Sequence, residues 1–265
     1  MPADITHSDP LRFDLLVEVV PGESSFGHLP ALPGLCFRAK EVSNLESVAL
    51  AQIAAYARWL LAEGLVDLTP EAAAVVHRLR TDSLAAIQVI EVERREGWPL
   101  WVSGNPAVLF RHDHQPLGDP TVAAHLRFTR QVLSRIRTLV EPLSAAQGAS
   151  KAAPDRRSID QTLTHIGNCI WWYCSRIDDE LPEPEGDPDE LPLDRIDRLL
   201  EDATEFLIGI PLGARSTVHV PTRFPTKDSS EPWTHAKVCR RQAEHVWEHL
   251  PGIQDAVAGA FGYDA

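Results

Sequence analysis

The chain has 265 residues, of which 44% are hydrophobic and 24% are charged, which is the balance of a folded protein with a sizeable core. Its formal net charge of -13 speaks against binding to nucleic acid or to anionic membrane surfaces, because both require a basic patch. The chain shows no signal-peptide pattern and no apolar run long enough to cross a membrane, so we expect a cytoplasmic protein whose cysteines are reduced.

The first half of the chain predicts a small antiparallel sheet. β-branched and apolar residues at Phe13–Val20 predict a strand, and Phe26–Leu29 and Cys36–Lys40 predict two more. The last two flank the turn-forming segment Leu32-Pro33-Gly34. Short strands separated by such turns are typical of an antiparallel meander.

Two helices and a further strand are predicted next. Ser43 and Glu46 have the spacing of a capping box, and an apolar stripe predicts a helix that ends near Glu63-Gly64. Thr69-Pro70 predicts the start of a second helix, and Ala86–Glu93 predicts another strand. The first half is therefore an α+β unit.

The order strand, turn, Leu32-Pro33-Gly34, strand and long helix, over residues 11–65, resembles HicB-like domains. The resemblance implies their fold for this segment. HicB-like antitoxins usually carry a DNA-binding segment, and nothing basic of that kind follows here, so we carry over the fold alone. Toxin–antitoxin regulation stays as a third possibility, which predicts salt-sensitive DNA binding.

The second half predicts an up-down bundle of four helices. Apolar residues recur at steps of three and four over Val122–Val140 and Ile159–Ile177, as expected of helices that pack nearly antiparallel. Leu193–Leu207 predicts a third helix. Pro232–Leu250 predicts a fourth, which we expect to end at Pro251-Gly252.

Proline-rich connections separate these segments. Glu180–Leu191 is acidic and is expected to be exposed, and Pro211–Glu231 is long enough to cover one end of the bundle. Arg111–Pro120 is the best candidate for a domain boundary. We therefore predict an α+β domain over residues 1–115 and a helical bundle over residues 116–265.

Three histidines are candidate metal ligands. His245 and His249 lie four residues apart, so a helix places both imidazoles on one face and within reach of one ion. They flank an apolar stripe, and His165 has a comparable position on the second helix of the bundle, so the rings converge if the two helices are neighbours. The alternative is that the pair arises by chance, with rings at the surface or bonded to a carbonyl.

A second resemblance covers residues 119–255. The segment Ser158–Ile166, with Trp171-Trp172-Tyr173, then Trp233-Thr234 and the histidine pair, resembles the DinB-like (DinB/YfiT) four-helix bundle proteins. The resemblance implies that the three histidines bind a divalent metal ion, and we expect zinc or nickel. Characterised relatives include metal-dependent thiol transferases and hydrolases. We therefore expect a metal-binding protein of this kind, which takes a small-molecule substrate or a thiol.

Two other functions are open. His245–His249 also fits the inverted zincin pattern His-x-x-Glu-His, in which Glu248 is the general base. Such enzymes need a later acidic ligand, and only Asp255 and Asp264 follow. The other function is a non-catalytic scaffold whose α+β unit engages a protein partner.

Several weaker candidates have structural alternatives. His112-Asp113-His114 is expected to be a solvated loop, and Cys169 is expected to be a buried structural cysteine although it lies on the same face as His165. Arg240-Arg241 suits an anionic substrate, but ion pairs on the helix surface are expected. Trp171, Trp172 and Trp247 are candidates for a substrate pocket or for the core.

The α+β unit has two candidate roles. It shields the open coordination position of the metal, or it supplies a surface for a homodimer through an apolar strand edge at Phe13–Val20.

Overall fold

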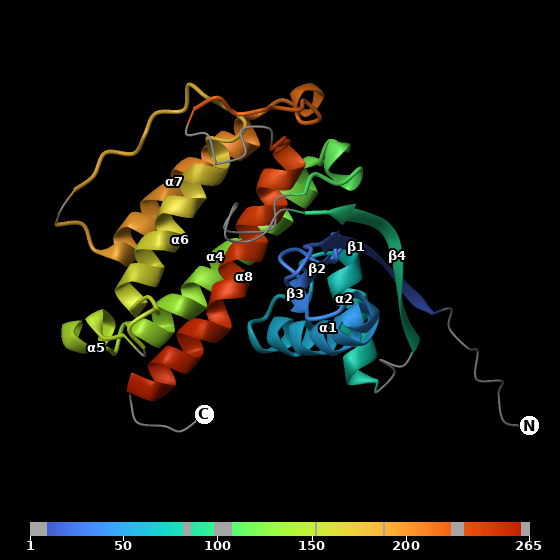
Figure 1. Cartoon of the computed structure of the whole chain (residues 1–265), viewed down its shortest axis with the longest axis horizontal. Helices are drawn as coiled ribbons and strands as arrows, with labels where there is room; N and C mark the ends of the chain where they lie inside the picture. Colours follow the sequence, from blue (N-terminus) through green and yellow to red (C-terminus); the bar gives the residue numbers. More distant parts are fainter. Residues whose placement is uncertain are drawn as a thin grey trace, which may run out of the picture.

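A computed structural model describes residues 10–81, 86–97, 108–151, 153–187, 189–223 and 231–260. These residues form a mixed α/β structure, in which a four-stranded sheet lies beside a group of long helices (Figure 1). The elements are β1 (Leu11–Val19), β2 (Ser25–His28), β3 (Cys36–Ala39), α1 (Leu45–Ala62), α2 (Pro70–Arg80), β4 (Ile87–Glu96), α4 (Asp119–Val140), α5 (Ala145–Ala149), α6 (Ile159–Cys174), α7 (Pro192–Gly209) and α8 (His235–Ala260).

The sheet is mixed, so the prediction of a wholly antiparallel sheet is wrong. Its order is β3-β2-β1-β4, and the meander of β1, β2 and β3 is antiparallel as predicted. β4 pairs parallel with β1, because α1 and α2 provide the long crossover that a parallel pair requires. β1 is therefore paired on both sides, and its edge is not available as the dimer surface that we expected.

The two helices of the α+β part begin differently. Thr69 caps α2 as predicted, since its side chain accepts a hydrogen bond from the backbone N–H of Ala72 and Pro70 occupies the first turn. The capping box predicted at Ser43 is wrong. A short 3₁₀ turn over Val42–Asn44 precedes α1 and contains Ser43, so the helix begins one residue later without a side-chain cap.

Four long helices make up most of the second half. α8 packs against α4 and α6, and α7 packs against the same two helices, so the contacts form a closed ring. α8 does not end at Pro251-Gly252 as we expected, but continues to Ala260. Ile253 and Val257 are buried beyond the proline, and their burial offsets the backbone hydrogen bond that Pro251 removes.

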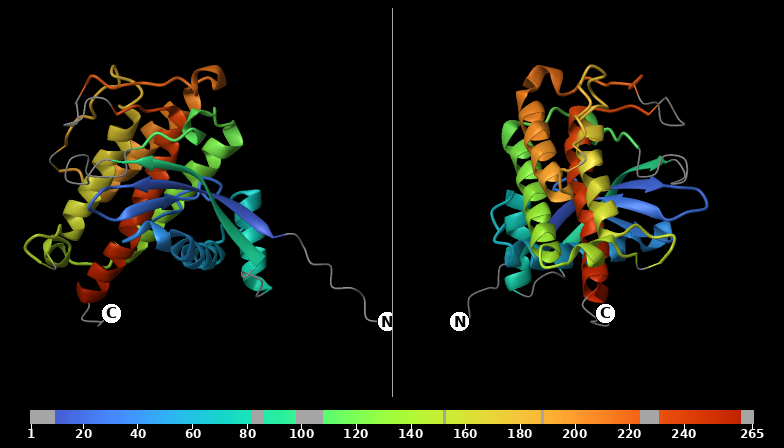
Figure 2. Two further views of the ribbon diagram at one scale, coloured as in Figure 1. Left: turned by 45° about the vertical axis from the view of Figure 1, so that its right-hand side comes forward. Right: turned by 90° about the vertical axis from the view of Figure 1, so that its left-hand side faces the viewer.

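α8 lies between the sheet and the other long helices (Figure 2). One hydrophobic cluster includes residues from both halves of the chain. Gly34 shows how close the approach is: its φ is +81°, and a Cβ atom there would clash with the ring of Phe128 on α4. The Leu-Pro-Gly turn therefore docks on the helical half through a glycine that no other residue replaces without strain.

None of the described helices combines the length with the apolar composition that spanning a membrane requires.

Candidate metal centre

Three histidines from two neighbouring helices lie together. His165 belongs to α6, whereas His245 and His249 lie one turn apart on α8, which contacts α6 (Figure 1). The Nε2 atom of His245 lies 3.2 Å from the Nε2 atom of His165 and 3.1 Å from that of His249. The structure thus brings together all three residues that the sequence singled out as ligands.

A capping box fixes where α6 begins and therefore which side of the helix His165 occupies. The Ser158 side chain accepts a hydrogen bond from the backbone N–H of Gln161, and the Gln161 side chain accepts one from the backbone N–H of Ser158. His165 lies at the edge of the buried face of this helix and is half-buried. The buried residues of α6 are Ile159, Leu163, Ile166, Gly167, Ile170, Tyr173 and Cys174.

The metal-free histidines are neutral at neutral pH. Burial, with the nearby charge of Arg157, lowers the pKa of His165 and of His249 to about 4. Burial also lowers the pKa of His245 well below its usual value, and the two neighbouring rings add to this effect. A neutral imidazole is the form that binds a metal, so no proton has to leave before an ion is bound.

The arrangement of the three Nε2 atoms suits coordination of a divalent ion better than it suits hydrogen bonds among the rings. The Nε2 atom of a neutral imidazole either donates one hydrogen bond or accepts one. The Nε2 atom of His245 has two neighbouring Nε2 atoms and therefore forms a good hydrogen bond with only one of them. Nitrogens bound at about 2.0–2.1 Å to a tetrahedral zinc ion lie about 3.3 Å apart. The two measured separations, 3.2 and 3.1 Å, are close to that spacing.

A cavity of about 880 Å³ adjoins the histidines, which form part of its wall. Trp171 and Trp172 also line it, as does the connection after α6 through Glu183. Arg38, on β3, contributes from the sheet. The cavity is therefore built by both halves of the chain, although the sequence suggested no chemistry in the first half.

Cys169 lies beside the histidines, and it is half-buried rather than the fully buried structural cysteine that we expected. Its Sγ atom lies 3.6 Å from the Nδ1 atom of His165. Burial raises the pKa of this thiol to about 12, so it is protonated in the metal-free protein. In the described structure Cys169 therefore contacts the ring of His165 as a neutral thiol.

The three tryptophans divide between cavity and core. Trp171 and Trp172 line the cavity. Trp247 instead packs among the rings of Tyr56, Trp59 and Phe128. It therefore joins α8 to α1 and α4 in the core. Although Trp247 lies between His245 and His249 in the sequence, its ring packs against these core rings and does not line the cavity.

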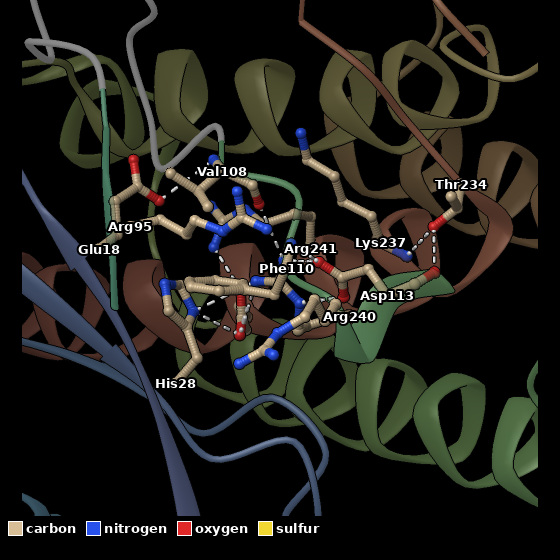
Figure 3. A network of polar contacts seen from close by, with 12 residues as sticks. Glu18, His28, Arg95, Val108, Phe110, Asp113, Thr234, Lys237, Arg240 and Arg241 are labelled. Carbon is tan, nitrogen blue, oxygen red and sulfur yellow. Dashed lines mark hydrogen bonds and ion pairs between the residues drawn. The ribbon is translucent and has the colours of Figure 1, made fainter. Parts of the chain in front are cut away.

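A buried polar network includes Arg240, Arg241 and Glu244 of α8, which lie within five residues before His245 (Figure 3). Arg240 binds the Asp113 carboxylate through its Nε and Nη2 atoms at 2.9 and 2.7 Å. Glu244 accepts hydrogen bonds from Arg241 at 2.6 Å and from the Nδ1 atom of His28 on β2 at 2.8 Å. The network thus ties the sheet to α8, the helix that carries His245 and His249.

The network corrects two predictions. Arg240 and Arg241 form ion pairs, but these are buried between the sheet and the bundle rather than exposed on the helix surface. His112 and His114 are exposed as expected, but Asp113 between them is fully buried in a short 3₁₀ turn and is not solvated. Burial raises the pKa of Asp113, but Arg240 outweighs this effect and lowers it below its usual value.

A second group of possible ligand atoms lies in this network. His28, Cys36 and Glu244 each place one such atom within 4.8 Å of the others. Glu244 already pairs with Arg240 and Arg241, and a cation bound there would face two buried guanidinium groups. Among the described residues, no hydrogen bond or ion pair joins the three-histidine cluster to an arginine or a lysine, so this cluster is the better candidate.

Glu248 lines the cavity next to the histidine pair. Its carboxylate accepts contacts from the Cys36 thiol at 3.6 Å and from Arg241 at 3.4 Å. The inverted zincin alternative requires a later acid as ligand: Asp255 is exposed, and Asp264 lies outside the described residues. In the structure the third possible ligand beside His245 and His249 is His165, not an acidic residue.

Sequence reasoning missed several residues around the site. The pairs Arg240–Glu244 and Arg241–Glu244 have helical spacings of four and three residues, and this signal was available in the sequence. Arg38 and His28 gave no such signal, because each reaches the helical half only through the tertiary fold.

No protein-family model, no curated protein and no solved structure matches the chain.

Proposed function

We propose that the chain is a DinB-like metalloprotein in which His165, His245 and His249 bind one divalent metal ion, zinc or nickel. The observation that carries the proposal is the convergence of three neutral imidazoles, with Nε2 separations of 3.2 and 3.1 Å. The proposal includes an up-down four-helix bundle for the second half. The closed ring of contacts among α4, α6, α7 and α8 supports it, as does the order of the motifs on α6 and α8.

The proposed activity is transfer of a thiol to an electrophile, or hydrolysis of a small molecule. A divalent ion at this site would lower the pKa of a bound water or thiol and so supply a nucleophile near neutral pH. The histidines act as ligands and not as bases, because their Nε2 atoms face one another at 3.1–3.2 Å. The cavity of about 880 Å³ has room for a small substrate beside them.

We assign the first half a HicB-like fold and the role of shielding the site. The turn Leu32-Pro33-Gly34 between β2 and β3, followed by the long helix α1, supports the fold. Arg38 on β3 lines the cavity, which supports the shielding role. DNA binding is not part of this proposal.

The test is isothermal titration of zinc and of nickel into untagged protein stripped of metal with a chelator. We expect one equivalent to bind. His245→Ala removes a direct ligand and should weaken binding beyond the about 10–100-fold that is typical for loss of an outer-shell partner. His77→Ala is the matched control, because His77 is exposed on α2, far from the cluster, and this variant should bind as the wild type does.

The same titration separates this proposal from the scaffold alternative. A scaffold should bind no zinc and should tolerate His245→Ala without any change in its metal content. A third outcome, salt-sensitive DNA binding in a gel-shift assay, would instead support regulation through the HicB-like half.

A further inference from the structure

The charged side chains that line the cavity are unevenly paired. Two of them are acids: Glu248 pairs with Arg241 at 3.4 Å, and Glu183 pairs with Arg223 at 3.9 Å. Arg195 pairs with Glu190 at 3.4 Å. Three of the charged groups around the cavity therefore already have partners of opposite charge within the protein.

Arg38 and Arg157 have none. Both are exposed and line the cavity, and within the described part of the chain neither forms an ion pair with a carboxylate. The guanidinium group of Arg38 lies over the ring of Phe26 at 4.9 Å, which orients it without neutralising its charge. In a chain with a net charge of -13, two unpaired cations lining one cavity are unexpected.

The charges of Arg38 and Arg157 also act on the histidines of the candidate metal centre. The charge of Arg157 acts on all three histidines, and that of Arg38 acts on His249. Two positive groups beside a cation site repel the ion, and this repulsion is relieved when an anion lies between them. The arrangement is thus matched to a ligand that brings negative charge into the cavity.

We propose that Arg38 and Arg157 bind the anionic group of the substrate, a carboxylate or a phosphate, in the cavity beside the three histidines. This inference rests on the proposed metal site and names the substrate class for it. Guanidinium groups bind either anion through paired, charge-assisted hydrogen bonds. Trp171 and Trp172 line the same cavity, so the rest of the substrate has an apolar or planar part.

The inference gives the sheet a direct role in substrate binding. Arg38 belongs to β3, whereas Arg157 immediately precedes the cap of α6. An anion held by both would therefore bridge the two halves of the chain. The shielding role proposed for the first half becomes a role in choosing the substrate.

The test uses zinc-loaded protein titrated with benzoate, with phenyl phosphate and with neutral benzamide. We expect both anions to bind, and we expect Arg38→Gln with Arg157→Gln to weaken that binding by about tenfold or more. Arg130→Gln is the matched control, since Arg130 is exposed on α4 away from the cavity, and this variant should bind as the wild type does. Added salt should weaken the binding of both anions to the wild type.

Benzoate and phenyl phosphate together show which anion the site prefers. Benzamide binding as tight as that of benzoate would overturn the proposal, as would undiminished anion binding by the double variant. Zinc titration of the same samples keeps the two proposals apart. Zinc binding without arginine-dependent anion binding refutes the substrate class alone, whereas arginine-dependent anion binding by protein that takes up no zinc refutes the metal site alone.

Discussion

The Nε2 atom of His245 on α8 lies 3.2 Å from the Nε2 atom of His165 on α6, although the two residues are 80 positions apart in the sequence. Two devices hold this distance. The capping box at Ser158 sets the start of α6, and the buried network around Arg240 fixes α8 against the sheet. The candidate metal centre therefore depends on packing far from the ligands themselves.

The pH dependence of stability should report on the histidines. In the metal-free protein the pKa of His165 and of His249 is about 4, below the value of about 6.5 expected when unfolded. The unfolded chain therefore binds more protons between these values, and the free energy of unfolding should fall as the pH drops from about 6.5 towards 4. Urea unfolding of chelator-treated protein at pH 7.5 and at pH 5 measures this loss.

The double variant His165→Gln, His249→Gln isolates the contribution of these two groups. It should lose less stability between the two pH values than the wild type does, because glutamine does not titrate. His77→Gln, at an exposed position on α2, is the control and should behave as the wild type does. An equal loss in the double variant and the wild type would contradict the assignment.

Gly34 should be intolerant of any side chain. Gly34→Ala places a Cβ atom against the ring of Phe128 and forces a residue other than glycine into the left-handed region, at an expected cost of about 2–4 kcal/mol. Gly64→Ala is a matched control, because Gly64 also has a positive φ but has open space around it. Its cost should be about 1–2 kcal/mol. Equal losses in chemical denaturation would show that the turn does not dock on α4.

The ion pair between Asp113 and Arg240 should matter far more than a pair at the surface. Asp113→Ala removes the carboxylate that pairs with the buried guanidinium group of Arg240, and it should lower the free energy of unfolding by about 3–5 kcal/mol. Glu91→Ala breaks the exposed pair with Arg94 and should cost about 1 kcal/mol or less. If the two variants unfold at the same urea concentration, the network does not anchor α8.

The sequence predicted local features better than long-range ones. Thr69 and Ser158 cap their helices with side chains close in sequence, so their roles follow from spacing alone. The parallel pairing of β4 with β1 joins residues 76 or 77 positions apart, and no local pattern encodes it. α8 continues beyond Pro251 because burial of the later apolar residues Ile253 and Val257 outweighs the tendency of the proline to end the helix.

The candidate site shows the same division. The spacing of His245 and His249 indicated that they share a helix face, and the position of His165 beside an apolar stripe, with the resemblance of the motif, added the third residue. Arg38 was not predictable, because it reaches the cavity only when the sheet docks beside α8. The burial of Arg240 was also hidden, since an arginine on a helix is normally exposed and only the sheet covers this one.

The most direct test of the metal centre is anomalous diffraction at the zinc absorption edge from crystals grown with zinc. The account predicts one strong peak at about 2.0–2.1 Å from the Nε2 atoms of His165, His245 and His249. The absence of a peak among these rings would contradict it, as would a peak confined to the group formed by His28, Cys36 and Glu244.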